Sequence, residues 1–227
     1  MRIGGMAALI VGALAGALLS ATPALAQKSG GSSQPTMQTP RQYTPYALSQ
    51  LDSRVARVVR QARSNQQRAI SAARRARDAA IRAERAGVDQ PQRGYGIQAP
   101  GEQYTGDRYA GQWRDGFKQG LGVYTFAINA SNPDNESASL RYEGNWSDDN
   151  YAGLGVFNWR SGHHYEGPFV AGHEEGAGVF TYQTGRRYEG EHTAGKENGY
   201  GVLWGADGQV EQAGVWSMGT LVTPLSR

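Results

Sequence analysis

A short phrase that recurs along the second half of the chain constrains the fold more than any other feature. The sequence YEGNW at 142–146 returns as YEGPF at 165–169 and as YEGEH at 188–192, at intervals of 23 residues, and YAGQW stands at 109–113. A second phrase of the form GxGV keeps the same step, with copies that begin at Gly120, Gly153, Gly176 and Gly199. A fixed period in this range indicates an array of structural repeats.

Each repeat predicts a β-hairpin. Its two apolar and aromatic runs are short and are bounded by Gly and Asp, as in strands joined by tight turns. Alternation places Tyr142, Gly144 and Trp146 on one face of the strand and Glu143 on the other. A single hairpin is not stable in water, so the units must stack. The sequence therefore predicts a mainly β fold, an elongated single-layer antiparallel meander of about nine strands over residues 94–216.

The glycines of the second phrase stand beside large rings. A strand glycine leaves room for an aromatic ring to lie flat on neighbouring backbone, which offsets the cost of the glycine itself. The first two copies of each phrase are 33 residues apart rather than 23. We therefore expect an insertion within residues 127–140, in a loop that decorates the array.

The two phrases resemble the MORN repeat, whose motif is roughly YEGxW, a turn, GxGxx and a second turn that contains glycine. The resemblance covers residues 104–204 and extends weakly to 94–97 and 212–216. It implies an elongated, single-layered sheet that works as a scaffold or binding platform, often near membranes. Ala110 stands in place of the motif's Glu, and Phe169 and His192 stand in place of its Trp.

The N-terminus has the features of a cleaved secretory signal peptide over residues 1–26. An apolar stretch from Met6 to Leu19 is followed by an A-x-A pattern at 24–26, and it is shorter than the roughly 20 residues of a membrane span. The chain contains no cysteine, so it has neither a lipid-bearing cysteine nor a disulfide framework. We expect an exported protein, in a bacterial periplasm first, and otherwise secreted or peripheral to a membrane. Residues 27–43 have the composition of a disordered linker.

Residues 44–87 predict one long Arg/Ala-rich α-helix, with Thr44 as its N-cap and Gly87 as its stop. Apolar residues recur at steps of three and four from Leu48 to Ala86, in a heptad stripe. At about 1.5 Å per residue the rod would be about 65 Å long. The stripe permits either a coiled coil in a homo-oligomer or packing on another surface. Beyond the helix we expect a linker and half-repeat over 88–106, the repeat sheet over 107–216 and a C-terminal tail over 217–227.

Charge is divided between the two regions. Residues 44–87 carry ten Arg against three acidic residues (+7), and residues 88–227 carry ten basic and seventeen acidic residues (−7). An exported protein rarely meets nucleic acid, so the basic helix is expected to bind its own sheet, an anionic membrane or envelope surface, or an acidic protein. The arginines of this basic helix face are Arg54, Arg57, Arg60, Arg63, Arg68, Arg74, Arg75, Arg77, Arg82 and Arg85.

Opposite charges in one chain favour contact between helix and sheet, but exposed ion pairs are weak and screened by salt. About nine strands at a spacing of about 4.8 Å would span about 43 Å, less than the rod. We therefore expect a weak, salt-sensitive contact near the linker through Ala69–Ala86, with the Leu48–Val58 half projecting.

The residue types of an enzyme active site do not converge anywhere in this pattern. The four histidines are His163, His164, His173 and His192. The chain has no cysteine that could complete a metal site with them. No acidic residue is placed in the sequence so that it would orient one of them as a catalytic base. Glu143, Glu166 and Glu189 recur at one repeat position, which places them too far apart for a paired acid/base site. We expect a protein without catalytic activity, metal or cofactor.

The aromatic ladder on one face of the sheet is the constellation most suited to binding. A single-layer sheet leaves a face open, although rings in such arrays also pack on one another. The candidate binding residues are Tyr109, Trp113, Tyr142, Trp146, Tyr165, Phe169 and Tyr188. The leading interpretation is a non-enzymatic exported scaffold that binds a protein or an envelope component through the sheet. The alternative is binding to anionic lipid or a membrane surface through the Arg-rich helix.

Overall fold

The computed structural model describes residues 48–98, 106–127 and 139–225, which belong to one compact unit. The predicted signal peptide, the predicted disordered linker and the first residues of the predicted helix lie outside these ranges. Residues 128–138, most of the predicted insertion, also lie outside them.

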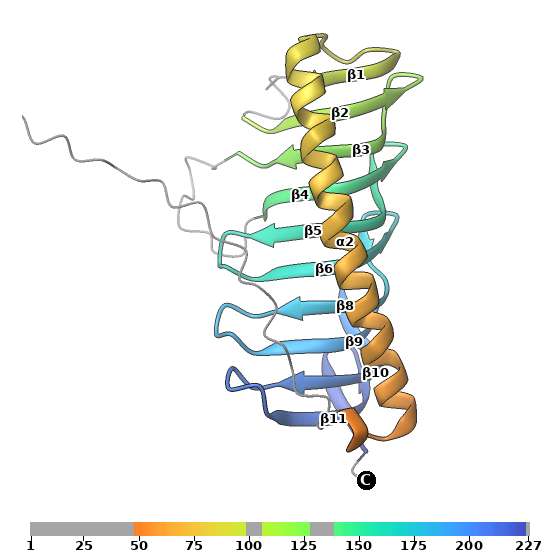
Figure 1. Cartoon of the computed structure of the whole chain (residues 1–227), viewed down its shortest axis with the longest axis vertical. Helices are drawn as coiled ribbons and strands as arrows, with labels where there is room; N and C mark the ends of the chain where they lie inside the picture. Colours follow the sequence, from red (N-terminus) through yellow and green to blue (C-terminus); the bar gives the residue numbers. More distant parts are fainter. Residues whose placement is uncertain (1–47, 99–105, 128–138, 226–227) are drawn as a thin grey trace, which may run out of the picture. The chain divides into compact units, whose positions relative to one another are not determined.

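The described strands form one antiparallel sheet that does not close on itself. They follow one another in chain order from β1 to β12, except that β7 pairs with β6 beside the main path (Figure 1). The strands are β1 (Arg93–Gln98), β2 (Arg108–Arg114), β3 (Phe117–Thr125), β4 (Ser139–Ser147), β5 (Asn150–Trp159), β6 (His164–Val170), β7 (His173–Glu174), β8 (Gly176–Thr181), β9 (Arg187–Thr193), β10 (Lys196–Trp204), β11 (Val210–Ser217) and β12 (Thr220–Pro224). The predicted antiparallel meander is confirmed.

The sheet extends further than predicted at its C-terminal end. β12 lies within the predicted tail and pairs with β11, with Val215 opposite Thr223. At the other end, β1 pairs with β2 through Gly94 and Trp113. The prediction of about nine strands is too low because the terminal hairpins lack a full copy of the phrase and still complete the hydrogen-bond ladder.

The repeated tyrosine lies across glycine backbone on the face that we call the ring face, which carries Tyr142, Gly144 and Trp146. A Cβ atom on Gly155, in the next strand, would lie 2.6 Å from the Tyr142 ring. The Tyr142 hydroxyl donates to the Asn145 carbonyl at 2.7 Å. Tyr109, Tyr165 and Tyr188 make the equivalent bond three residues along their own strands. The ring can take this position only where the residue beneath it lacks a side chain.

Gly155→Ala should therefore destabilise the protein by about 2 kcal/mol, because the added methyl group displaces a buried ring. Urea unfolding followed by circular dichroism measures the change. The three atoms nearest to the position of the added methyl group all belong to Tyr142, so in a Tyr142→Ala background the same substitution should cost less than about 0.5 kcal/mol. Equal costs in the two backgrounds would contradict the stacking argument.

The long helix α2 (Ser53–Ala86) begins later than predicted. Asp52 is its N-cap and accepts a hydrogen bond from the Arg54 backbone N–H at 2.9 Å. Gly87 ends the helix in the left-handed conformation, with φ at 63°. The predicted start at Thr44 is wrong for this helix, since the chain leaves helical geometry at residues 50–52 before Asp52 caps α2.

The heptad period of α2 matches the hairpin period of the sheet. Seven residues of helix advance about 10.5 Å, and two strands occupy about 9.6 Å, so each heptad meets one hairpin. Ala62, Ala69, Ala76 and Ala83 stand seven residues apart and are all completely buried. Figure 1 shows α2 crossing one face of the sheet, which we call the helix face, from β10 to β1.

This docking along the full length contradicts the predicted weak contact near the linker. Val55, in the half predicted to project, and Val59, just beyond it, pack with Val202 and Trp204 of β10. The 34 residues of α2 span about 51 Å, and the ten intervals between the strands of the main path span about 48 Å. The prediction is wrong because it assumed a longer helix and a narrower sheet. The heptad stripe is covered by the sheet, which leaves no open seam for the predicted coiled coil.

Candidate functional site

The seven aromatic residues predicted to bind a partner form the core of the ring face instead. None of them is more than 5% exposed. Their rings meet edge to face, for example Tyr142 with Trp146 at 5.3 Å and with Phe169 at 5.2 Å between centroids. In this structure the following predicted residues offer no open surface to a ligand: Tyr109, Trp113, Tyr142, Trp146, Tyr165, Phe169 and Tyr188.

The hydroxyl groups of the buried tyrosines serve the fold. Burial raises the pKa of Tyr109, Tyr142, Tyr165 and Tyr188 well above the usual value for tyrosine. The hydroxyls therefore stay protonated and keep donating to backbone carbonyls. Their role is to hold each ring flat on the sheet.

A second set of rings on the ring face is half-buried and was not predicted as a site. We call it the outer aromatic row: Tyr124, Phe126, Trp159, Phe180 and Tyr182. Adjacent rings lie close together, with centroid distances of 4.8 Å for Tyr124–Phe126, 5.5 Å for Trp159–Phe180 and 4.8 Å for Phe180–Tyr182. These residues stand two and four positions after the second glycine of GxGV. Continuing the strand alternation past that phrase would have identified them.

The repeated glutamates lie on the helix face and hold α2. Glu189 is completely buried; it accepts hydrogen bonds from Arg63 Nε at 2.9 Å and from Trp204 Nε1 at 3.1 Å, and it pairs with Arg187. Burial raises the pKa of the Glu189 carboxyl, with Arg187 and Arg63 acting in the opposite direction. The site is a structural anchor that joins helix and sheet.

Glu143 and Glu166 repeat this arrangement along the helix. Glu143 pairs with Arg77 of α2 at 3.2 Å and with Arg141 of its own strand at 2.6 Å, and Glu166 accepts a hydrogen bond from Gln66. The contacts of these glutamates with α2 were not predicted from the sequence. Within the ranges that the structure describes, no group of three or more His, Asp or Glu side chains could hold a metal ion.

The predicted basic helix face divides into two sets. Arg63 and Arg77 bind the buried glutamates, and Arg54 pairs with Asp52 and donates to the Tyr200 hydroxyl at 3.4 Å. The remaining seven are exposed, and we call them the outward arginine face: Arg57, Arg60, Arg68, Arg74, Arg75, Arg82 and Arg85. The acidic residues of α2 are Asp78 and Glu84, and Glu84 pairs with Arg108 of β2.

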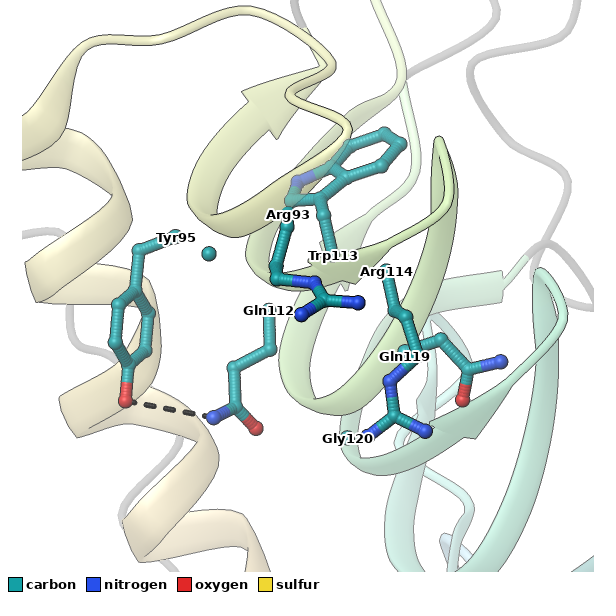
Figure 2. Close-up of a pocket in the computed structure, with 8 residues that line it drawn as sticks. Arg93, Tyr95, Gln112, Trp113, Arg114, Gln119 and Gly120 are labelled. Carbon is teal, nitrogen blue, oxygen red and sulfur yellow. Dashed lines mark hydrogen bonds between the residues drawn. The ribbon is translucent and has the colours of Figure 1, made fainter.

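A pocket of about 480 Å³ opens at the β1 end of the sheet, where β1, β2 and β3 meet. Figure 2 shows Arg93, Gln112, Arg114 and Gln119 extending from these strands around it, with Tyr95 on the side of α2. Gly94, Trp113 and Gly120 complete its wall. No pattern in the sequence indicates this pocket, since Arg93 lies outside the full repeats and Arg114 lies beside a turn.

The fold defines a repeat protein in which hairpins stack into one open sheet. The sequence profile of the MORN repeat matches residues 109–130, 142–164, 165–185 and 188–210. The repeated hairpins of this sheet are MORN repeats. A search of curated proteins found no significant match. Across the described residues, no helix has the length and apolar character needed to cross a membrane.

Proposed function

We propose that this protein is an exported, non-catalytic binding protein that binds to an anionic membrane surface through its outward arginine face. The observation that carries the proposal is the division of α2 into two sides. Its inner side is fixed on the sheet by buried alanines and by the glutamate anchors. Its outer side carries seven exposed arginines and, apart from the paired Glu84, one carboxylate, Asp78. The family's repeats are binding modules, which supports a role of this kind.

The electrostatic attraction between these arginines and an anionic bilayer is strong enough to support membrane binding. A basic residue near an anionic bilayer contributes about 1 kcal/mol, and the attraction falls off within a Debye length of about 10 Å in 0.1 M salt. Because α2 is packed on the sheet along its length, its exposed arginines are already held in place before binding. Binding therefore avoids the loss of conformational freedom that a flexible basic segment incurs. Export follows from the N-terminal sequence pattern and forms part of the proposal.

Vesicle co-sedimentation tests the proposal. The protein should bind phosphatidylglycerol vesicles at low salt, bind them weakly at high salt and leave phosphatidylcholine vesicles unbound. The triple variant Arg74→Gln/Arg75→Gln/Arg85→Gln should bind at least about tenfold more weakly. Arg54→Gln, which changes an arginine already paired with Asp52, is the matched control and should bind nearly as well as the parent protein. Equal binding by the triple variant would refute the role of this face.

A second candidate function is supported by the outer aromatic row. Half-exposed Tyr and Trp rings combine apolar surface with polar groups, as in many protein interfaces. On this view the ring face binds a protein or another envelope component. Trp159→Ser separates the two functions in the same experiment. If Trp159→Ser weakens binding and the triple arginine variant does not, the ring face is the binding surface.

A further inference from the structure

The pocket at the β1 end of the sheet gathers positive charge without any internal neutralisation. Arg93 lies directly opposite Arg114 in the ladder between β1 and β2, and like charges in that arrangement repel. The lining contains no acidic side chain. Neither arginine takes part in an ion pair formed among the described residues.

On the α2 side of the pocket, Tyr95 and Gln112 form a separate polar group (Figure 2). The Tyr95 hydroxyl oxygen accepts bonds from Arg82 Nη1 at 3.2 Å and from Gln112 Nε2 at 3.4 Å, so its own hydrogen is left to donate. The Gln112 side-chain carbonyl already accepts from the Leu121 backbone N–H at 2.7 Å. The pocket therefore combines two cations with a hydroxyl donor. The side-chain oxygen of Gln112, beside Tyr95, already accepts a hydrogen bond.

The buried indole of Trp113 belongs to the core of the ring face, on the opposite side of β2 from Arg114, so it does not face the two arginines. Trp146 and Trp216 donate their Nε1–H groups to the carbonyls of Gly122 and Gly201 at 3.2 Å. Trp113 is only 5% exposed, and its Nε1 has no acceptor among the described residues.

From this geometry we infer that the pocket between β1 and β3 binds an oxyanion, a carboxylate or a phosphate group, through Arg93 and Arg114. Guanidinium forks match the geometry of both oxyanions and form charge-assisted hydrogen bonds with them. An anion between the strands also relieves the repulsion between the facing arginines. The site is separate from the outward arginine face and does not depend on membrane binding.

The test is an NMR titration of ¹⁵N-labelled protein with sodium phosphate and, separately, with sodium acetate. Sodium chloride keeps the ionic strength constant. The amide signals of Gly94 and Gly120 and the Nε–H signals of Arg93 and Arg114 should shift and saturate at millimolar anion. Saturation with phosphate alone would identify a phosphate site, and saturation with both anions would extend it to carboxylates.

Variants make the result decisive. Arg114→Gln should weaken the titration at least about fivefold, whereas Arg75→Gln, an exposed change on the outward arginine face, should leave it unchanged. Shifts that rise without saturation, or that persist in Arg114→Gln, would mean an adventitious ion only and overturn the inference. Arg114→Gln should also keep its binding to phosphatidylglycerol vesicles, so failure of one proposal is distinguishable from failure of the other.

Discussion

Glu189→Ala should lower the free energy of unfolding by about 3 to 5 kcal/mol. The carboxylate is completely buried, and its removal leaves Arg187, itself 5% exposed, and Arg63 without their shared anion. It also removes the acceptor of the Trp204 indole N–H at 3.1 Å. Urea unfolding followed by circular dichroism measures the loss, and tryptophan fluorescence reports the change around Trp204.

An exposed ion pair between the same helix and the sheet provides the control. Glu84 of α2 pairs with Arg108 of β2, and their side chains are 45% and 41% exposed. Glu84→Ala should cost less than about 1 kcal/mol, because solvent and salt already weaken that pair. If the two variants lost similar amounts of stability, the buried anchor would not be what secures the helix.

We infer that the Glu189 anchor contributes more to the alignment of α2 than to net stability. Burial raises the pKa of Glu189 even though two arginines oppose the shift, which means that desolvation of the carboxylate outweighs its attraction to them. Breaking the group is costly, while an apolar replacement of the whole group could be nearly neutral. We infer that Glu143, Glu166 and Glu189 select which heptad of α2 meets which hairpin, since the alanine stripe looks alike at each step.

The repeats could be predicted from the sequence because their period and alternation are local properties. Two phrases at a common spacing are enough to define hairpins, and Gly155 beneath Tyr142 follows from the same pattern. The position of the helix could not be predicted in this way. A heptad stripe shows that one side of a helix is buried, but it does not say whether the partner is a second helix or a sheet. The feature that favours a sheet over a second helix is that one heptad of helix and one two-stranded hairpin of sheet have nearly the same length.

The sequence predicts which face of the sheet carries the candidate binding rings, but it does not predict which of these rings are buried. Alternation puts Tyr142 and Trp159 on the same face of the sheet. Whether a ring is buried depends on how neighbouring strands stack sideways: Tyr142 turns back over glycine and stacks with Tyr151 at 4.1 Å. Trp159, near a strand end, keeps part of its surface open. The pocket at Arg93 was equally hidden, because it depends on a strand outside the full repeats.

His192 should make the stability of the protein depend on pH between about 6.5 and 4. It stands where Phe169 stands one repeat earlier, is only 3% exposed, and lies between the rings of Tyr165 and Tyr188 at 4.9 and 5.2 Å. Neither ring nitrogen meets the geometry of a hydrogen bond with a described residue, although the backbone of Gly190 and of Gly176 lies close enough to favour the charged ring. Burial lowers the pKa of His192 from 6.5 to about 4, although Glu197 and Glu175 act in the opposite direction.

Proton binding by the unfolded chain sets the direction of this effect. Near pH 5 the unfolded chain holds a proton on this imidazole and the folded chain does not, so acid favours unfolding. The stability is fully present above pH 6.5 and is lost as the pH falls to about 4. The difference between those two pKa values corresponds to a loss of about 3.5 kcal/mol, at about 1.4 kcal/mol per pH unit.

His192→Phe should remove this loss, because a phenyl ring already fills the equivalent position at Phe169 with the same edge-to-face contacts. Urea unfolding at pH 7, 6, 5 and 4 should show a shallower decline for His192→Phe than for the parent protein. His173→Gln, a change at an exposed histidine of β7, is the control and should keep the parent's decline. Carboxylates that contact neither His192 nor His173 contribute the same decline to all three proteins. Parallel curves for the parent and His192→Phe would therefore show that the imidazole is protonated without unfolding the array.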